Sequence, residues 1–294
     1  MSGKNLIRNI ITIFAMILTA LLYLIFILVI RILFTTPTAD SIIHKANIGV
    51  ISIFSLAIVI CFIIMAVVTM KEFNYMKLYA NELTYNGLSE ALRNATLKRK
   101  DRFKNKFSVG YVGSVNILAN FLSYEYKYDE AIEMLEEFDL VELKDKMGLE
   151  KARPMKDNIV TYFGLLDNLM SLYCQKGDTE KADMLYELFN PLYNAYIHKY
   201  DYLTDVLYEA KIKYCILKGN ISEADSLLDI LKTSSPVLYA YLTMEKFEKT
   251  GYEEDALNSI LEEANNNLEN RVQFKKYYSD LLERKKKELT DKQV

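Results

Sequence analysis

The sequence predicts an all-α protein in which an N-terminal two-helix transmembrane hairpin is followed by an α-solenoid. Two uncharged apolar runs predict the membrane helices, because a helix needs roughly 20 apolar residues to cross the hydrocarbon core. A layout of paired helices that recurs after Met70 predicts the solenoid. Glycine and proline together number only 14 in 294 residues, which agrees with helices throughout the chain.

The membrane hairpin occupies residues 1–70 in this interpretation. Ile10–Ile30 contains 21 uncharged residues and Ile48–Met70 contains 23, so we place the spans at about 10–34 and 48–70. A cleaved signal peptide is the alternative for the first run, but this run is long for such a segment and no clear cleavage site follows it. The short link with Pro37 predicts that the two helices are antiparallel.

Basic residues orient the hairpin. Lys4 and Arg8 precede the first span and a dense basic cluster follows the second, so the positive-inside rule places both termini in the cytoplasm, with the hairpin in the plasma or inner membrane. Neither uncharged run holds Asp, Glu, Lys, Arg or His, and Arg31 lies at the edge of the first span. Ionisable residues inside a span usually mark transport or proton pathways. We therefore expect the hairpin to be an anchor.

Residues 71–106 predict a basic juxtamembrane helical hairpin with a net charge of +5. The second span is expected to continue as a helix to about Tyr85, and Asn86-Gly87 then turns the chain back. Basic side chains gather at the end of the returning helix: Lys98, Arg99, Lys100, Arg102, Lys104 and Lys106. We expect them to contact lipid headgroups, because each cation near an anionic leaflet contributes about 1 kcal/mol. A solvated basic face is the alternative.

Four stretches of the following segment share one layout: Tyr126–Ala131, Gly177–Ala182, Gly219–Ala224 and Gly251–Ala256. Each follows an amphipathic helical run and begins a second helix. In three of them a glycine lies five residues before the alanine, where it allows the first helix to end in a left-handed conformation. An Asp, Asn or Ser then caps the second helix, whose alanine permits close approach.

This layout resembles the tetratricopeptide repeat family. The resemblance implies that residues 107–265 form a solenoid whose first helices line a concave groove that holds a peptide or a partner helix. The four alanines are 51, 42 and 32 residues apart, whereas a regular array would hold near 34. An insertion or bend is therefore expected at Asp139–Asn158. Residues 266–294 are expected to form a charged capping helix. An irregular helical bundle without a groove is the alternative.

The candidate groove residues come from the first helix of each unit. They are Asn116, Asn120, Tyr124, Asp167, Ser171, Gln175, Glu209, Lys213, Tyr241 and Glu245. This set lacks the concentration of Lys and Asn with which some family members grip a C-terminal carboxylate, which argues against a ligand of that kind.

Catalytic, cofactor-binding and metal-binding patterns are absent from the sequence. His44 and His198 have no ligand-like neighbours, and the cysteines Cys61, Cys174 and Cys215 lack metal spacing and are expected to be small buried hydrophobes. No phosphate-binding loop or hydrolase motif occurs. The chain after Lys106 carries a net charge of −11, which makes nucleic acid an unlikely partner.

These observations predict a non-enzymatic, membrane-anchored scaffold or adaptor that binds a protein or peptide partner and needs no cofactor. The alternative is a membrane-embedded assembly or regulatory subunit that acts through its transmembrane hairpin, and an enzyme is the third class. The abundance of Lys, Asn, Ile and Tyr indicates a bacterial origin in an AT-rich genome.

Overall fold

The computed structural model describes residues 23–24, 27, 42–85, 88–103, 105–151, 153–197 and 199–251 of the chain. Every regular element in these ranges is helical, so the predicted all-α class is confirmed for the described residues. The chain divides into two compact units, Met1–Lys77 and Leu78–Val294.

The long helix α2 (Ile42–Tyr85) supplies the membrane-length segment. Its stretch Leu56–Glu82 is long and apolar enough to cross a membrane. The hydroxyl of Thr69 donates to the carbonyl of Met65 at 2.8 Å, so this polar group is satisfied within the helix, as a hydrocarbon environment requires. The helix ends at the predicted residue, Tyr85.

The first predicted span lies outside the described residues, apart from helical Tyr23, Leu24 and Ile27. The two-span hairpin therefore stays a prediction. The expected capping helix at 266–294 also lies outside the described part of the chain.

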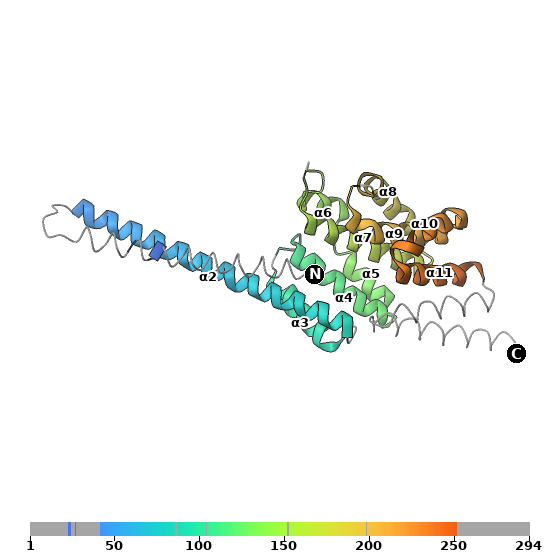
Figure 1. Cartoon of the computed structure of the whole chain (residues 1–294), viewed down its shortest axis with the longest axis horizontal. Helices are drawn as coiled ribbons and strands as arrows, with labels where there is room; N and C mark the ends of the chain where they lie inside the picture. Colours follow the sequence, from blue (N-terminus) through green and yellow to red (C-terminus); the bar gives the residue numbers. More distant parts are fainter. Residues whose placement is uncertain are drawn as a thin grey trace. The chain divides into compact units, whose positions relative to one another are not determined.

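The second unit contains a succession of shorter helices. They are α3 (Glu90–Arg102), α4 (Val109–Tyr124), α5 (Tyr128–Leu135), α6 (Leu140–Lys146), α7 (Lys156–Lys176), α8 (Thr179–Tyr196), the 3₁₀ turn η1 (Asp201–Leu203), α9 (Thr204–Lys218), α10 (Ile221–Ser234) and α11 (Pro236–Thr250). In Figure 1, α6 lies above α4, and α10 and α11 lie at the opposite side of this group of helices.

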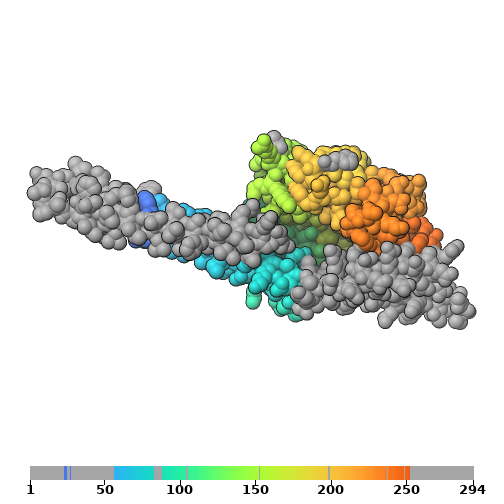
Figure 2. Space-filling model, in the orientation of Figure 1, coloured from blue at the N-terminus to red at the C-terminus, as the bar shows by residue number. Residues whose placement is uncertain are grey.

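These helices form two layers, which we call the first and the second layer. In the first layer, α4 packs against α7, α7 against α9, and α9 against α11. In the second layer, α5 packs on α4 and α7, α8 on α7 and α9, and α10 on α9 and α11. Figure 2 shows the side chains of this array packed closely from green through orange. Each second-layer helix therefore packs across the line of contact between two first-layer helices.

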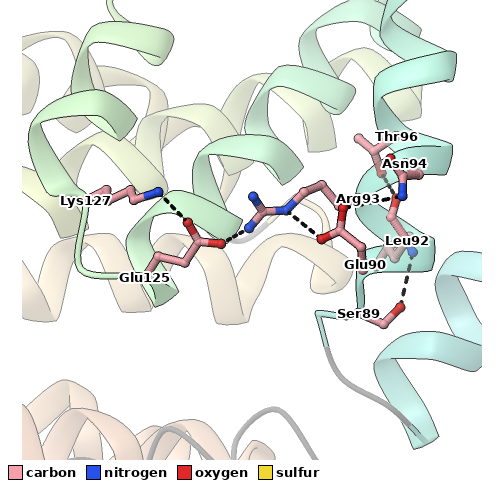
Figure 3. Close-up of polar contacts among 8 residues, drawn as sticks. All are labelled: Ser89, Glu90, Leu92, Arg93, Asn94, Thr96, Glu125 and Lys127. Carbon is pink, nitrogen blue, oxygen red and sulfur yellow. Dashed lines mark hydrogen bonds and ion pairs between the residues drawn. The ribbon is translucent and has the colours of Figure 1, made fainter.

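A polar bridge ties α3 to the end of α4 (Figure 3). The hydroxyl of Ser89 caps α3 by accepting from the backbone N–H of Leu92 at 3.1 Å. One helical turn along, the guanidinium of Arg93 pairs with the carboxylate of Glu125, which Lys127 also contacts at 3.0 Å. These contacts fix α3 against the array.

The turns between paired helices have the predicted left-handed residue. Gly177 and Gly219 end α7 and α9 at φ +69° and +73°. In the first pair, Tyr126 holds the corresponding place, five residues before Ala131, at φ +62°. A side chain is strained there, because its Cβ crowds the following carbonyl.

The predicted alanines of the second layer are fully buried. Ala131, Ala182 and Ala224 have no exposed surface. Four residues later, Leu135 and Leu228 are buried as well, and Tyr186 stacks on Tyr214 with ring centres 3.8 Å apart. Each of these alanines thus lies on the buried face of its second-layer helix. Ala256 lies outside the described residues.

The insertion expected at Asp139–Asn158 packs onto the array as α6 and the segment after it. The carboxylate of Asp139 caps α6, and Leu143 is buried in the common core. The hydroxyl of Tyr162 donates to the carbonyl of Leu140 at 3.1 Å, and that of Tyr196 donates to the carbonyl of Leu149 at 2.9 Å. Tyrosines of α7 and α8 therefore bond to the start and to the middle of this segment.

Substitution at the turn residues should change stability in opposite directions. Gly177→Ala is expected to lower the free energy of unfolding by about 1 kcal/mol, because the left-handed conformation strains a side chain. Nothing lies within 4 Å of the added Cβ, so the conformation alone sets this cost. Tyr126→Gly should instead be stabilising by less than about 1 kcal/mol, since glycine also gains freedom in the unfolded chain. Urea denaturation of both variants measures the two signs, and a destabilised Tyr126→Gly would contradict the strain.

Candidate functional site

A cluster of polar side chains lies where three first-layer helices meet. Each helix contributes two residues spaced four apart, which places both on one face of that helix. The pairs are Asp167 and Ser171 in α7, Glu209 and Lys213 in α9, and Tyr241 and Glu245 in α11. Each pair stands 15 and 11 residues before the alanine of its repeat, so the three pairs occupy the same position in successive units.

Lys213 is the centre of this cluster, with a side chain that is 4 % exposed. Its ammonium donates to the carboxylate of Glu209 and, at 2.6 Å, to the hydroxyl of Ser171. The ammonium also lies 5.1 Å from the centre of the Tyr241 ring. The Tyr241 hydroxyl donates to the carboxylate of Glu245 at 2.5 Å. One ammonium group thus joins α7, α9 and α11.

The charges in the cluster are strongly coupled. Burial by itself lowers the pKa of Lys213, but the carboxylates of Glu209, Glu245 and Asp167 more than offset this and raise the pKa above its usual value. Burial raises the pKa of Asp167 well above its usual value, and the negative charges of Glu209 and Glu245 add to this effect while Lys213 opposes it. Three carboxyl groups face one ammonium, so the cluster is net negative when all are ionised.

Two buried acceptors on α7 lack a hydrogen-bond partner in the described part of the chain. They are Oδ1 of Asp167 and Oε1 of Gln175. A buried acceptor without a donor typically costs about 1–3 kcal/mol, and most buried polar atoms in folded proteins are paired. Both oxygens therefore keep an unused capacity to accept a hydrogen bond.

The remaining predicted groove residues lie on α4. Tyr124 is 38 % exposed as a whole residue. Burial of its hydroxyl, and then the charge of Glu209, raise its pKa to about 12. Asn116 accepts a hydrogen bond from Nδ2 of Asn168 at 2.7 Å, which joins α4 to α7, and Asn120 is half-buried. The structure thus gathers six of the predicted residues in one network with Tyr124 near it, whereas Asn116 and Asn120 stay on α4.

The sequence pattern did not indicate a role for Asn168. It directly follows Asp167 and lies at the α4–α7 junction rather than on the face that carries the cluster. Its only signal in the sequence is a second polar residue inside the apolar run of α7.

The predicted headgroup-contact residues are not equivalent. Lys98, Arg102 and Lys106 are exposed and Lys100 is half-buried, while Lys104 lies outside the described residues. Arg99 was expected at the surface with them, but the structure corrects this expectation.

Arg99 is only 7 % exposed. Its guanidinium donates to the carbonyl of Gly110 at 2.7 Å and to the hydroxyl of Ser114 at 3.0 Å, and it lies over the ring of Phe103. The guanidinium is therefore held between α3 and α4 and is not available to a lipid headgroup.

The cysteines offer no reactive thiolate in the second unit. Burial raises the pKa of Cys174 and of Cys215 to about 12, with nearby Glu245 and Glu223 adding to the effect. Both thiols are therefore protonated at neutral pH, as expected for small buried hydrophobes, whereas Cys61 is exposed on α2. Among the described residues, no group of His, Cys, Asp and Glu is suited to hold a metal ion.

Comparison with protein-family models, with curated proteins and with solved structures finds no match for this chain. Its function is therefore inferred from the polar cluster and from the arrangement of the helices.

Proposed function

We propose that this chain is a membrane-anchored scaffold or adaptor in which a tetratricopeptide-like array binds a protein partner through its first layer. The polar cluster around Lys213 is the observation that carries this proposal. Anchorage is supported by the membrane-length apolar stretch Leu56–Glu82. The basic residues on either side of the two apolar runs of the sequence favour a two-span hairpin with both termini in the cytoplasm.

The composition of the first layer supports a recognition role. Taking charges out of water is costly, and an apolar layer would hold α7, α9 and α11 together at least as well. Here charged and hydroxyl-bearing residues instead occupy one position in three successive repeats. A repeated position on stacked helices forms a continuous surface, which is how solenoid proteins bind extended partners.

The chemistry of this surface favours a partner segment that supplies donors. The carboxyl groups of Asp167, Glu209 and Glu245 outnumber the ammonium of Lys213, which is already paired with Glu209. The unpaired oxygens of Asp167 and Gln175 are acceptors as well. A segment with Lys or Arg side chains satisfies both features, whereas a free carboxylate would be repelled.

Site-specific photocrosslinking of the full chain in its native membrane tests the proposal. A crosslinking amino acid is placed at Asn120 or Gln175 in the first layer, and at exposed Met184 or Ile230 in the second layer as matched controls. We expect one partner to be captured from both first-layer positions and from neither control. Equal capture from both layers would contradict the proposal, as would a probe at Gln175 that reacts only with the chain's own C-terminal residues.

Exchange of both apolar runs for unrelated hydrophobic helices separates the scaffold from the alternative membrane-embedded subunit. The scaffold predicts that the same crosslinked partner is retained, because the hairpin serves only to anchor the array. Loss of the partner with correct membrane insertion would favour the alternative.

A further inference from the structure

The part of α3 that does not pack against α4 carries basic side chains on more than one face. Lys98 and Arg102 are four residues apart and exposed, and Leu97 beside them is 40 % exposed. Lys106 is exposed just beyond the helix, and Lys100 is half-buried. We call these five residues the α3 basic surface.

The buried side of α3 fixes the direction of this surface. Leu92, Thr96 and Arg99 are buried and recur at the spacing of one helical face. Arg99 fixes the orientation of that face, because its guanidinium donates hydrogen bonds to Gly110 and Ser114 of α4. Rotation of α3 about its axis would break these hydrogen bonds, so the side chains of Lys98 and Arg102 stay exposed to solvent.

The lysines of this surface have no counterion among the described residues. Within the described part of the chain, Lys98, Lys100 and Lys106 take part in no ion pair. By contrast, Lys144, which is in α6, pairs with Glu150 at 2.7 Å. Lysines without such a counterion are available to an anionic partner.

We propose that the α3 basic surface binds the anionic headgroups of the bilayer that α2 enters, an inference that rests on the proposed membrane anchorage. The uncharged run of α2 ends at Met70, and residues 71–97 join it to Lys98, so the same chain keeps the surface at a raised effective concentration near that bilayer. Leu97 adds an apolar contact of the kind that interfacial helices use. Nucleic acid is the less favoured polyanion, because the chain after Lys106 is acidic.

Amine acetylation of the full chain in lipid nanodiscs tests this contact. The acetylation rate of each lysine is measured by mass spectrometry in neutral discs and in discs of about one-third anionic lipid. An attraction of about 1 kcal/mol per lysine predicts rates about fivefold lower at Lys98, Lys100 and Lys106 in the anionic discs. High salt should remove the difference, because it screens surface charge. Lys146 in α6 is the internal reference.

A paired variant sharpens the test. Lys98→Gln with Arg102→Gln is expected to raise the rates at Lys100 and Lys106 in anionic discs towards the neutral value. Lys151→Gln with Lys249→Gln removes the same charge from exposed positions elsewhere, keeps the reference Lys146 and should change neither rate. Equal rates in both lipids would overturn the proposal, as would protection that appears only after a polynucleotide is added.

Alkaline carbonate extraction of the same membranes reports anchorage separately. A chain that resists extraction but shows no lipid-dependent rates would overturn the headgroup contact alone. A chain that is extracted would overturn the anchorage as well.

Discussion

Replacing Lys213 with methionine is expected to destabilise the helical array by about 3–5 kcal/mol at neutral pH, because it leaves buried carboxyl groups without their counterion. The ammonium joins Glu209 to Ser171 and lies over Tyr241, so its loss removes contacts among three helices at once. Methionine fills much of the same volume, so the effect reports the charge more than a cavity.

The pH dependence of this variant should reveal its cause. An unpaired, buried Asp167 carboxyl binds its proton more tightly in the folded variant than in the unfolded chain, so its folded pKa is the higher one. The stabilising contribution is then fully present below the unfolded pKa and is lost as the pH rises through the folded pKa. The loss of unfolding free energy that Lys213→Met causes should therefore become smaller as the pH falls towards about 4. Adding Asp167→Asn to Lys213→Met should recover part of the loss at neutral pH.

Urea denaturation in detergent, followed by near-ultraviolet circular dichroism of tyrosine, measures these changes. The chain has 22 tyrosines and no tryptophan, and all tyrosines except Tyr23 follow residue 70, so the signal reports the array. Lys218→Met is the matched control, because Lys218 pairs with Asp183 at a half-exposed site and the pair contributes about 0–1 kcal/mol. A Lys213 variant as mild as this control would contradict the central role of the cluster.

Removal of the Phe163 side chain is the second large expected effect. Phe163→Ala should lower the free energy of unfolding by about 3–5 kcal/mol, because it deletes a ring from the core and leaves a cavity. The ring is 1 % exposed on α7, and its centre lies 5.5 Å from that of Tyr196 in α8. Since α7 contacts α4, α5, α8 and α9, the cavity weakens the middle of the array.

Val160→Ala is the matched control for this substitution. Val160 is exposed on the same helix, so its truncation should change stability by no more than about 0.5 kcal/mol. The same denaturation measurement separates the two. Equal effects at both positions would mean that Phe163 does not lie in a packed core.

Features that follow from local chemistry could be predicted residue by residue. The apolar run of α2, its end at Tyr85, the left-handed Gly177 and Gly219 and the capping Asp178 all follow from short stretches of sequence. Burial of the second-layer alanines was also predictable, because a small residue recurs at the same place after each turn. The strain at Tyr126 became visible only once the backbone showed a tyrosine in the place of glycine.

The sequence could predict which candidate-site residues share a helix face, but it could not predict which of them contact one another across helices. Helical spacing identified Asp167, Glu209 and Lys213 as members of one surface. The sequence did not indicate that Lys213 is buried, because lysine is rarely buried and its partners lie on other helices. For the same reason Arg99 was grouped with its exposed neighbours, although its partner groups lie on α4.

The sequence by itself determined the helical class, the membrane-length apolar segment and the register of the repeats, because periodicity and turn chemistry act between residues a few positions apart. Only the tertiary structure decided which polar side chains meet and which charges are buried. Those outcomes depend on the packing of α3 on α4 and of α7, α9 and α11 on one another, and packing joins residues that lie far apart in the chain.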